Sequence, residues 1–184
     1  MWTYYILGGI AALVILWLIA AYNGLVRLRQ QAHEAESDID VQLKRRFDLV
    51  PNLVETVKGY AGHERQTLES VTEARTRFMS AKNTKEQLAA DNMLSDTLKT
   101  LFAVSESYPD LKANANFLEL QRELADTENK IQAARRFYNA NVRDLNVRVE
   151  QFPTNLVAGS FGFQKMDYFE AENEAERQPV AVKF

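Results

Sequence analysis

The first 26 residues of the chain contain no charged side chain. Between Trp2 and Tyr22 they form an almost continuous apolar run, and all 22 basic and 25 acidic residues lie beyond it. At about 1.5 Å per residue, a helix over residues 4–22 is roughly 28 Å long, close to the roughly 30 Å hydrocarbon core of a bilayer. The run therefore predicts a transmembrane anchor over residues 1–24.

Aromatic rings bracket this run, and such rings favour the membrane–water interfaces. A cleaved signal peptide is the alternative, but such peptides begin with basic residues and have a shorter apolar stretch. No Lys or Arg precedes this run, and the chain has no cysteine that could carry a lipid. The predicted anchor residues are Trp2, Tyr4, Tyr5 and Tyr22 at the interfaces and Trp17 at a greater depth.

Basic residues flank the run on its C-terminal side, beginning with Arg27 and Arg29. The positive-inside rule then predicts a single-pass protein whose large C-terminal part lies in the cytoplasm. The net charge of −3 gives no electrostatic footprint for nucleic acid.

Helical periodicity dominates the chain after the anchor. Apolar residues recur at spacings of three and four from Leu25 to Val50, so we expect the anchor helix to continue into the domain, with a kink or a short interruption at residues 48–52 because of Pro51. The apolar stripe then resumes and continues to Phe78. Asn83 and Thr84 predict a turn and an N-cap before a third helix, which should end before Pro109.

The last long helix has the most regular pattern of the chain, a coiled-coil-like seam with one stutter after Tyr138. We expect this helix to end near Phe152 and Pro153. The sequence therefore predicts an all-α fold, in which an N-terminal transmembrane helix continues into an antiparallel bundle of long helices over residues 25–163, followed by an acidic, partly irregular tail over residues 164–184. The seam consists of Phe117, Leu120, Leu124, Thr127, Ile131, Ala134, Tyr138, Val142, Leu145 and Val149.

Four segments carry a resemblance to a known family. YNGLVRLR, IDVQLKRRFDLVPNLVETVKGYAGHE, VSESYPDLKANANFLELQRELADTENKIQAARRFYNANVRDLN and FPTNLVAG resemble the LemA family, from the anchor nearly to the C-terminus. The resemblance implies an N-terminally anchored protein of the bacterial inner membrane with long antiparallel helices. It implies no established enzymatic activity. It also places relatives near membrane stress, metalloproteases and magnetosome membranes.

Nine residues form the candidate interaction surface. The leading interpretation of the basic residues 44–46 is that they lie on solvated helix faces. The alternatives are pairing with carboxylates of neighbouring helices, binding of anionic lipid and a protein interface. Buried polar residues beside the seam, such as Arg135 and Asn139, would fix helix register. Phe161 and Phe163 are expected to pack back on the bundle; the alternative is that they enter a neighbouring subunit or the membrane interface. The nine residues are Lys44, Arg45, Arg46, Tyr108, Lys112, Arg135, Arg136, Phe161 and Phe163.

Two further features receive structural interpretations. Asp110, directly after Pro109, is interpreted as an N-cap. The acidic run of the tail is interpreted as a solvating surface. It comprises Asp167, Glu170, Glu172, Glu174 and Glu176.

The sequence offers little for catalysis. His33 with Glu34 and His63 with Glu64 are adjacent pairs, whose side chains diverge by about 100° on a helix and so do not converge on one metal. Neither pair extends to HExxH, and the chain has no glycine-rich phosphate loop and no cysteine. We therefore expect no enzyme, no metal and no cofactor.

The leading functional hypothesis is a non-catalytic, membrane-anchored scaffold or adaptor that contacts membrane lipid, forms a homo-oligomer and organises other membrane proteins. The alternative is an accessory or regulator of a membrane protease or of an envelope-stress pathway, for which the family context is the reason. A channel is disfavoured because a single uncharged span offers no polar lining.

Overall fold

The computed structural model describes residues 1–169, and these residues form helices and connecting segments without a β-strand. The expected all-α class is confirmed. Four of the five residues of the acidic run, from Glu170 to Glu176, lie outside the described residues, and so does that interpretation. The helices are α1 (Trp2–Ala61), α2 (Arg65–Ser80), α3 (Thr84–Ser105), α4 (Pro109–Lys112), α5 (Ala115–Glu150) and α6 (Thr154–Ser160).

Helix α1 is one continuous helix of 60 residues, as expected for an anchor that continues into the domain. Pro51 lies inside it, so the chain is not interrupted at residues 48–52. A proline inside a helix costs about 3 kcal/mol. Its neighbours Phe47, Val50 and Leu53 are fully buried, and this packing offsets the cost.

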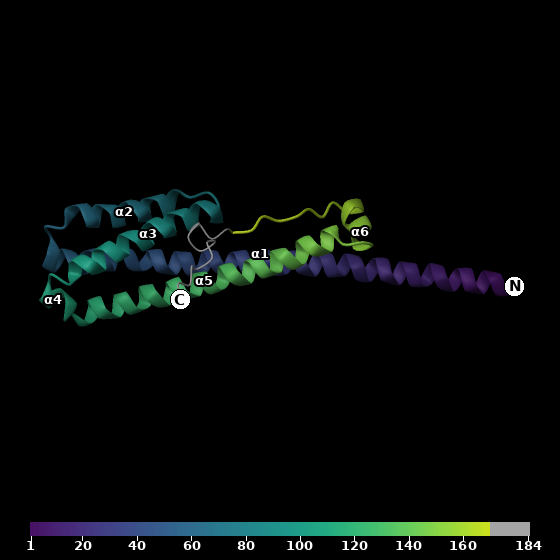
Figure 1. Cartoon of the computed structure of the whole chain (residues 1–184), viewed down its shortest axis with the longest axis horizontal. Coiled ribbons are helices and arrows are strands. Elements are labelled where there is room, and N and C mark those ends of the chain that lie inside the picture. Colours follow the sequence, from purple (N-terminus) through teal and green to yellow (C-terminus); the bar gives the residue numbers. More distant parts are fainter. Residues whose placement is uncertain (170–184) are drawn as a thin grey trace, which may run out of the picture. The chain divides into compact units, whose positions relative to one another are not determined.

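The chain divides into two compact units, unit 2 over residues 33–137 and unit 1 over residues 1–32 together with the chain from residue 138 onward. In unit 2, consecutive long helices run in alternating directions, which is the expected antiparallel bundle (Figure 1). Stacked rings of Phe47 and Phe78 join α1 to α2, and an edge-to-face contact of Phe102 and Phe117 joins α3 to α5. The predicted boundaries at residues 24 and 163 stay predictions.

The break in the first helical stripe lies at residues 62–64, about ten residues after Pro51. A Cβ atom at Gly62 would come within 3.2 Å of the Lys58 carbonyl oxygen, so this tight turn favours glycine. The single stripe expected from Leu53 to Phe78 is thereby divided between α1 and α2.

Side-chain caps fix the beginnings of two helices. The Asn83 side chain accepts a hydrogen bond from the Glu86 amide at the start of α3, as predicted. The prediction that Asp110 is an N-cap is wrong, because Asp110 lies within the first turn of α4. Asn114 serves this purpose instead, since its Oδ1 atom accepts from the Phe117 amide at 3.0 Å at the start of α5.

Unit 1 is built around the last turns of α5 and the short helix α6. Gly162 has a φ of +69°, and the Phe163 amide donates to the Ala158 carbonyl at 2.9 Å, a closing motif that favours glycine at the turn. The turn carries Phe163 into a small apolar cluster. Its buried members are Leu25, Leu145, Val157, Ala158 and Phe163.

Candidate functional site

Among residues 1–169, α1 is the one helix whose length and composition would allow it to cross a membrane. Residues 2–20 of this helix are exposed, including Leu13 at 68% and Trp2 at 85%. Exposed apolar surface of this extent marks a site of contact with a membrane or with another protein. The arrangement is consistent with a membrane anchor.

A buried charged cluster joins three helices of unit 2. The Arg46 Nη1 atom on α1 donates to Asp91 Oδ1 at 2.6 Å and to Ser95 Oγ at 3.1 Å, both on α3. It also bonds Glu128 on α5, whose second oxygen accepts from Gln132. Arg46 is 3% exposed and Asp91 1% exposed. We call these residues the Arg46 cluster.

The electrostatics of the Arg46 cluster are dominated by the cost of burial. Desolvation raises the pKa of the Asp91 carboxyl from 3.8 to about 6. The positive charge of Arg46 opposes this rise, whereas the nearby carboxylate of Glu128 adds to it. Because Arg46 is shared between two carboxylates, it cannot fully compensate the desolvation of Asp91.

Arg46 and Arg135 therefore do not belong to an exposed interaction surface. Arg135 on α5 is 8% exposed, and its charge also lowers the pKa of Asp91. For Arg46, the alternative of pairing with carboxylates of neighbouring helices is the correct one. The burial of Arg46 is indicated by its position on the helix, because Arg46 lies three residues after Leu43 and four before Val50, on the buried stripe of α1.

A second polar contact joins α1 and α3 in unit 2. Thr84 at the start of α3 donates to the Glu36 side chain at 3.3 Å. Burial raises the pKa of the neighbouring Asp40 carboxyl, while a hydrogen bond from Thr84 opposes the rise. This contact was not predicted from the sequence.

The other predicted surface residues of unit 2 lie at or near its surface. Lys44, Arg45 and Arg136 are exposed. Tyr108 is partly buried and donates from its phenol to Glu64 at 2.9 Å, which raises the pKa of the tyrosine. Lys112 forms an ion pair with Glu106. Of the nine predicted residues, seven belong to unit 2 and two to unit 1, and the interaction surface stays a prediction.

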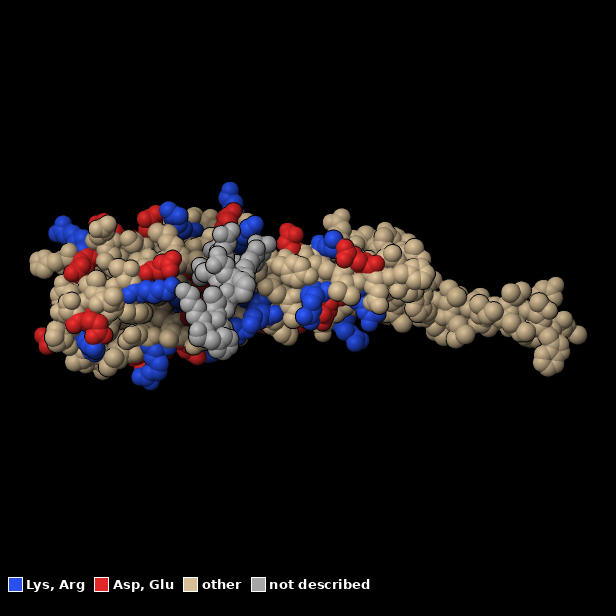
Figure 2. Space-filling model, viewed as in Figure 1, with Lys and Arg blue, Asp and Glu red and all other residues tan. Residues whose placement is uncertain are grey.

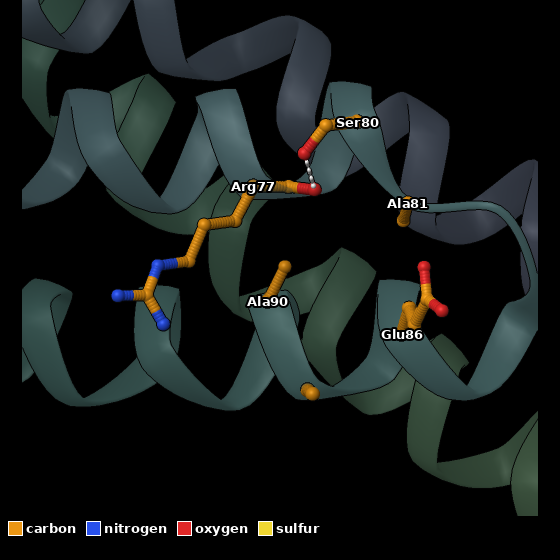
Figure 3. Close-up of a pocket in the computed structure, with 6 residues that line it drawn as sticks. Arg77, Ser80, Ala81, Glu86 and Ala90 are labelled. Carbon is orange, nitrogen blue, oxygen red and sulfur yellow. Dashed lines mark hydrogen bonds between the residues drawn. The ribbon is translucent and has the colours of Figure 1, made fainter.

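Two shallow depressions lie between α2 and α3. The first is lined by Arg77 and Glu86, which lie on either side of Ala90 (Figure 3), and the Arg77 guanidinium pairs with Glu73 at 2.8 Å. In the second, the hydroxyls of Ser70, Thr97 and Thr100 donate to carbonyls of their own helices. Residues 1–169 hold no group of three His, Asp or Glu side chains suited to a metal. These depressions offer no evident catalytic arrangement.

In unit 1, aromatic rings gather at the C-terminal end of the apolar run. The Tyr22 ring makes edge contacts with Phe161 and Phe163, with centroids 4.9 and 5.7 Å apart. The Arg29 guanidinium lies 5.0 Å from the Phe163 centroid. Phe163 is 7% exposed and packs back as predicted, whereas Phe161 is 63% exposed.

Two asparagines of α5 hold the segment after α6, residues 163–169, which we call the strap. Asn146 accepts from the Met166 amide and donates to its carbonyl, both at 2.9 Å, and Asn139 makes the same pair of bonds with Phe169. The Tyr138 phenol donates to the Asp167 carbonyl at 2.9 Å. Asn139 was expected to fix helix register and instead binds the strap. Asn146 was missed, although its spacing of seven from Asn139 places both on one face of α5.

Comparison with known proteins agrees with this architecture. The model of the LemA family matches residues 35–184. The protein LemA of Metamycoplasma hominis is 29% identical, over 86% of this chain and 72% of its own length. The magnetosome proteins MamQ 1 of Paramagnetospirillum magneticum and MamQ of Magnetospirillum gryphiswaldense are each 24% identical, over 89% of this chain and 69% of their own lengths. Because the family model covers most of the residues, the chain belongs to the LemA family.

Proposed function

We propose that this protein is a non-catalytic scaffold or adaptor, anchored in the bacterial inner membrane by α1, that self-assembles and organises membrane proteins or a patch of membrane. The observation that carries the proposal is the continuity of α1. One helix begins as an uncharged run with exposed side chains and ends in a buried stripe of unit 2.

The mechanism is avidity. One span for each subunit confines the helical domains to the membrane plane, which raises their effective concentration and lets weak lateral contacts act together. The candidate contacts are the exposed predicted residues Lys44, Arg45, Arg136 and Lys112. The similarity to proteins named for the magnetosome supports a role at a membrane structure.

The described surface supports binding more than catalysis. Arg46 and Asp91 are buried among helices, and the hydroxyls at one depression between α2 and α3 already donate to backbone carbonyls. The titrating carboxyl with the largest pKa shift, Asp91, is therefore in no position to meet a substrate.

The test is the mass of the complex extracted from membranes in native nanodiscs, with the full chain and without detergent. We expect masses at multiples of the 21.0 kDa chain. A monomer alone would contradict the scaffold. A complex of one chain with a membrane protease would favour the alternative of a protease accessory.

A matched pair of variants locates the assembly contact. Gly8 lies four residues before Ala12, a small-residue spacing that permits close helix pairing, and Gly9 lies on a different face. A side chain at either glycine meets nothing within 4 Å. If the spans pair, Gly8→Leu reduces the oligomer and Gly9→Leu does not. If neither variant changes the mass, the helical domain carries the contact.

A further inference from the structure

Residues 151–164, which we call the α6 hairpin, form an uncharged segment outside the predicted span. One side of the hairpin packs on the protein through Val157 and Ala158. Three large apolar side chains of the hairpin are nevertheless exposed, which would be costly to leave in water at about 25 cal/mol per Å² of surface. These are Phe152 at 74%, Leu156 at 62% and Phe161 at 63% exposed.

Ring contacts fix where the α6 hairpin lies along α1. Phe161 and Phe163 both contact Tyr22, the last aromatic residue of the apolar run. Within unit 1, α6 lies beside α1 at the point where α1 begins to extend without a neighbouring helix (Figure 1). On the face shown in Figure 2, the uncharged surface of that extension continues onto the wider part of unit 1.

The order of side chains along α1 at this level matches the profile of a membrane interface. The apolar run ends at Tyr22, and the cations of Arg27 and Arg29 follow within two turns. Aromatic rings favour the headgroup level, and basic side chains favour its aqueous side. The Arg29 guanidinium lies over the ring of Phe163, so the cation and the hairpin meet at the same level.

We propose that the α6 hairpin is a second membrane contact, in which Phe152, Leu156 and Phe161 enter the interfacial layer of the leaflet from which α1 emerges. Apolar side chains of an element in the interface plane lie at the boundary of headgroups and acyl chains. The α6 hairpin does not cross the bilayer. This inference rests on the anchoring of α1 that the proposed function assumes.

Two points of contact restrict the protein more than one span does. A single helix can rotate about its own axis in a bilayer. A hairpin held to Tyr22 and inserted beside the helix fixes which face of unit 1 meets the lipid. The membrane then orients the domain for lateral contacts.

The experiment uses the full chain, which has no native cysteine, with one cysteine at a time carrying a nitroxide label. The test sites are Leu156→Cys and Phe161→Cys. The controls are Leu13→Cys in the span and Met79→Cys on α2, whose native side chains are both 68% exposed. Each labelled chain is reconstituted in vesicles of phosphatidylcholine and phosphatidylglycerol, and collisions with dissolved oxygen and with a water-soluble nickel chelate are measured.

Oxygen concentrates in lipid and the nickel chelate in water, so three environments are distinguishable. We expect the labels at Leu156 and Phe161 to collide several-fold less with nickel than the label at Met79, and several-fold more with oxygen, at a shallower depth than Leu13. Nickel collisions equal to those of Met79 would overturn the proposal. Low collisions with both reagents would also overturn it, because a second protein copy would then cover the hairpin. A water-exposed Leu13 label would instead refute the anchoring itself.

Discussion

The polar contacts inside the two units are of opposite kinds. In unit 2, three helices meet at the Arg46 cluster, where the charged groups of Arg46 and Asp91 are removed from water. In unit 1, neutral amides of Asn139 and Asn146 bind the backbone of the strap, and rings pack around Tyr22. A buried charge is costly when its partner is lost, and its protonation state depends on pH. A neutral amide does not titrate, and the loss of its partner costs less. The two units should therefore respond differently to mutation and to pH.

The largest expected effect comes from removing the shared cation of unit 2. Arg46→Met leaves the nearly inaccessible Asp91 without its main partner, so we expect a loss of about 3–5 kcal/mol in the free energy of unfolding. Glu128 contributes less, because its side chain is 31% exposed and remains hydrated. Denaturant unfolding of the full chain in micelles measures the loss.

Two further variants sharpen this result. The exposed neighbour Arg45→Met should change stability by less than about 0.5 kcal/mol. The double variant with Arg46→Met and Asp91→Leu should recover much of the loss, because the nearly inaccessible carboxyl of Asp91 is then no longer left without its main partner. Equal effects of Arg45→Met and Arg46→Met would mean that water reaches the cluster.

A smaller and more local effect is expected in unit 1. Asn146→Leu removes both hydrogen bonds to Met166, at a cost of about 1–3 kcal/mol. Hydrogen exchange should accelerate at the Met166 amide and leave the amides around Arg46 unchanged. Asn129→Leu, at an exposed position of the same helix, is the control. Unchanged exchange at Met166 would show that the strap does not depend on this pair.

The pH dependence of stability should also distinguish unit 2 from unit 1. The folded-state pKa of Asp91 is about 6, above its ordinary value of 3.8, so the folded chain takes up this proton first as the pH falls. The resulting stabilisation is complete below about pH 3.8 and is lost as the pH rises through about 6. Between pH 7 and pH 5, Asp91 should add about 1 kcal/mol to stability.

The check is to subtract the pH profile of Asp91→Asn from that of the native chain. The difference should show the rise toward low pH, while exchange protection of the neutral Asn146–Met166 pair should contribute no slope of its own. A flat difference between pH 7 and pH 5 would contradict the raised pKa.

The smallest expected effect concerns the rings of unit 1. Tyr22→Leu removes two edge contacts, which contribute about 0.5 kcal/mol each beyond the burial of area, the low end of the usual range because Phe161 is 63% exposed. Exchange at the Phe163 amide measures the local loss. Tyr22→Phe keeps the ring and should match the native chain; if it behaves like Tyr22→Leu, the phenol rather than the ring is responsible.

Features with a local cause were predictable from the sequence. The seam of α5 is read from a repeat within one helix, and Phe117, Leu124 and Ile131 are buried as it requires. The cap at Asn83 needs only the three residues that follow it. The ends of α3 and α5 lie before Pro109 and Pro153, because proline disfavours a continuing helix.

Features decided by partners distant in sequence were not predictable in the same way. Whether Pro51 or Gly62 ends α1 depends on how Leu53 and Val57 pack, and both are buried. Arg46 and its exposed neighbours have the same chemistry, and only the phase of α1 separates them. The strap depends on the hydrogen bond between Asn146 and the backbone of Met166, 20 residues further along the chain, and no local sequence pattern indicates this contact.

Unit 1 is assembled from the two ends of the described chain, and this imposes an order on synthesis. The apolar run and Tyr22 leave the ribosome first, whereas the residues that cover Leu25 and Tyr22 follow roughly 120–140 residues later. At about 5–20 residues per second, the N-terminal segment waits on the order of 6–28 seconds for them. All of unit 2 is translated in that interval. A nascent chain that stalls after residue 137 would carry every residue of unit 2 and leave the start of α1 without its partners.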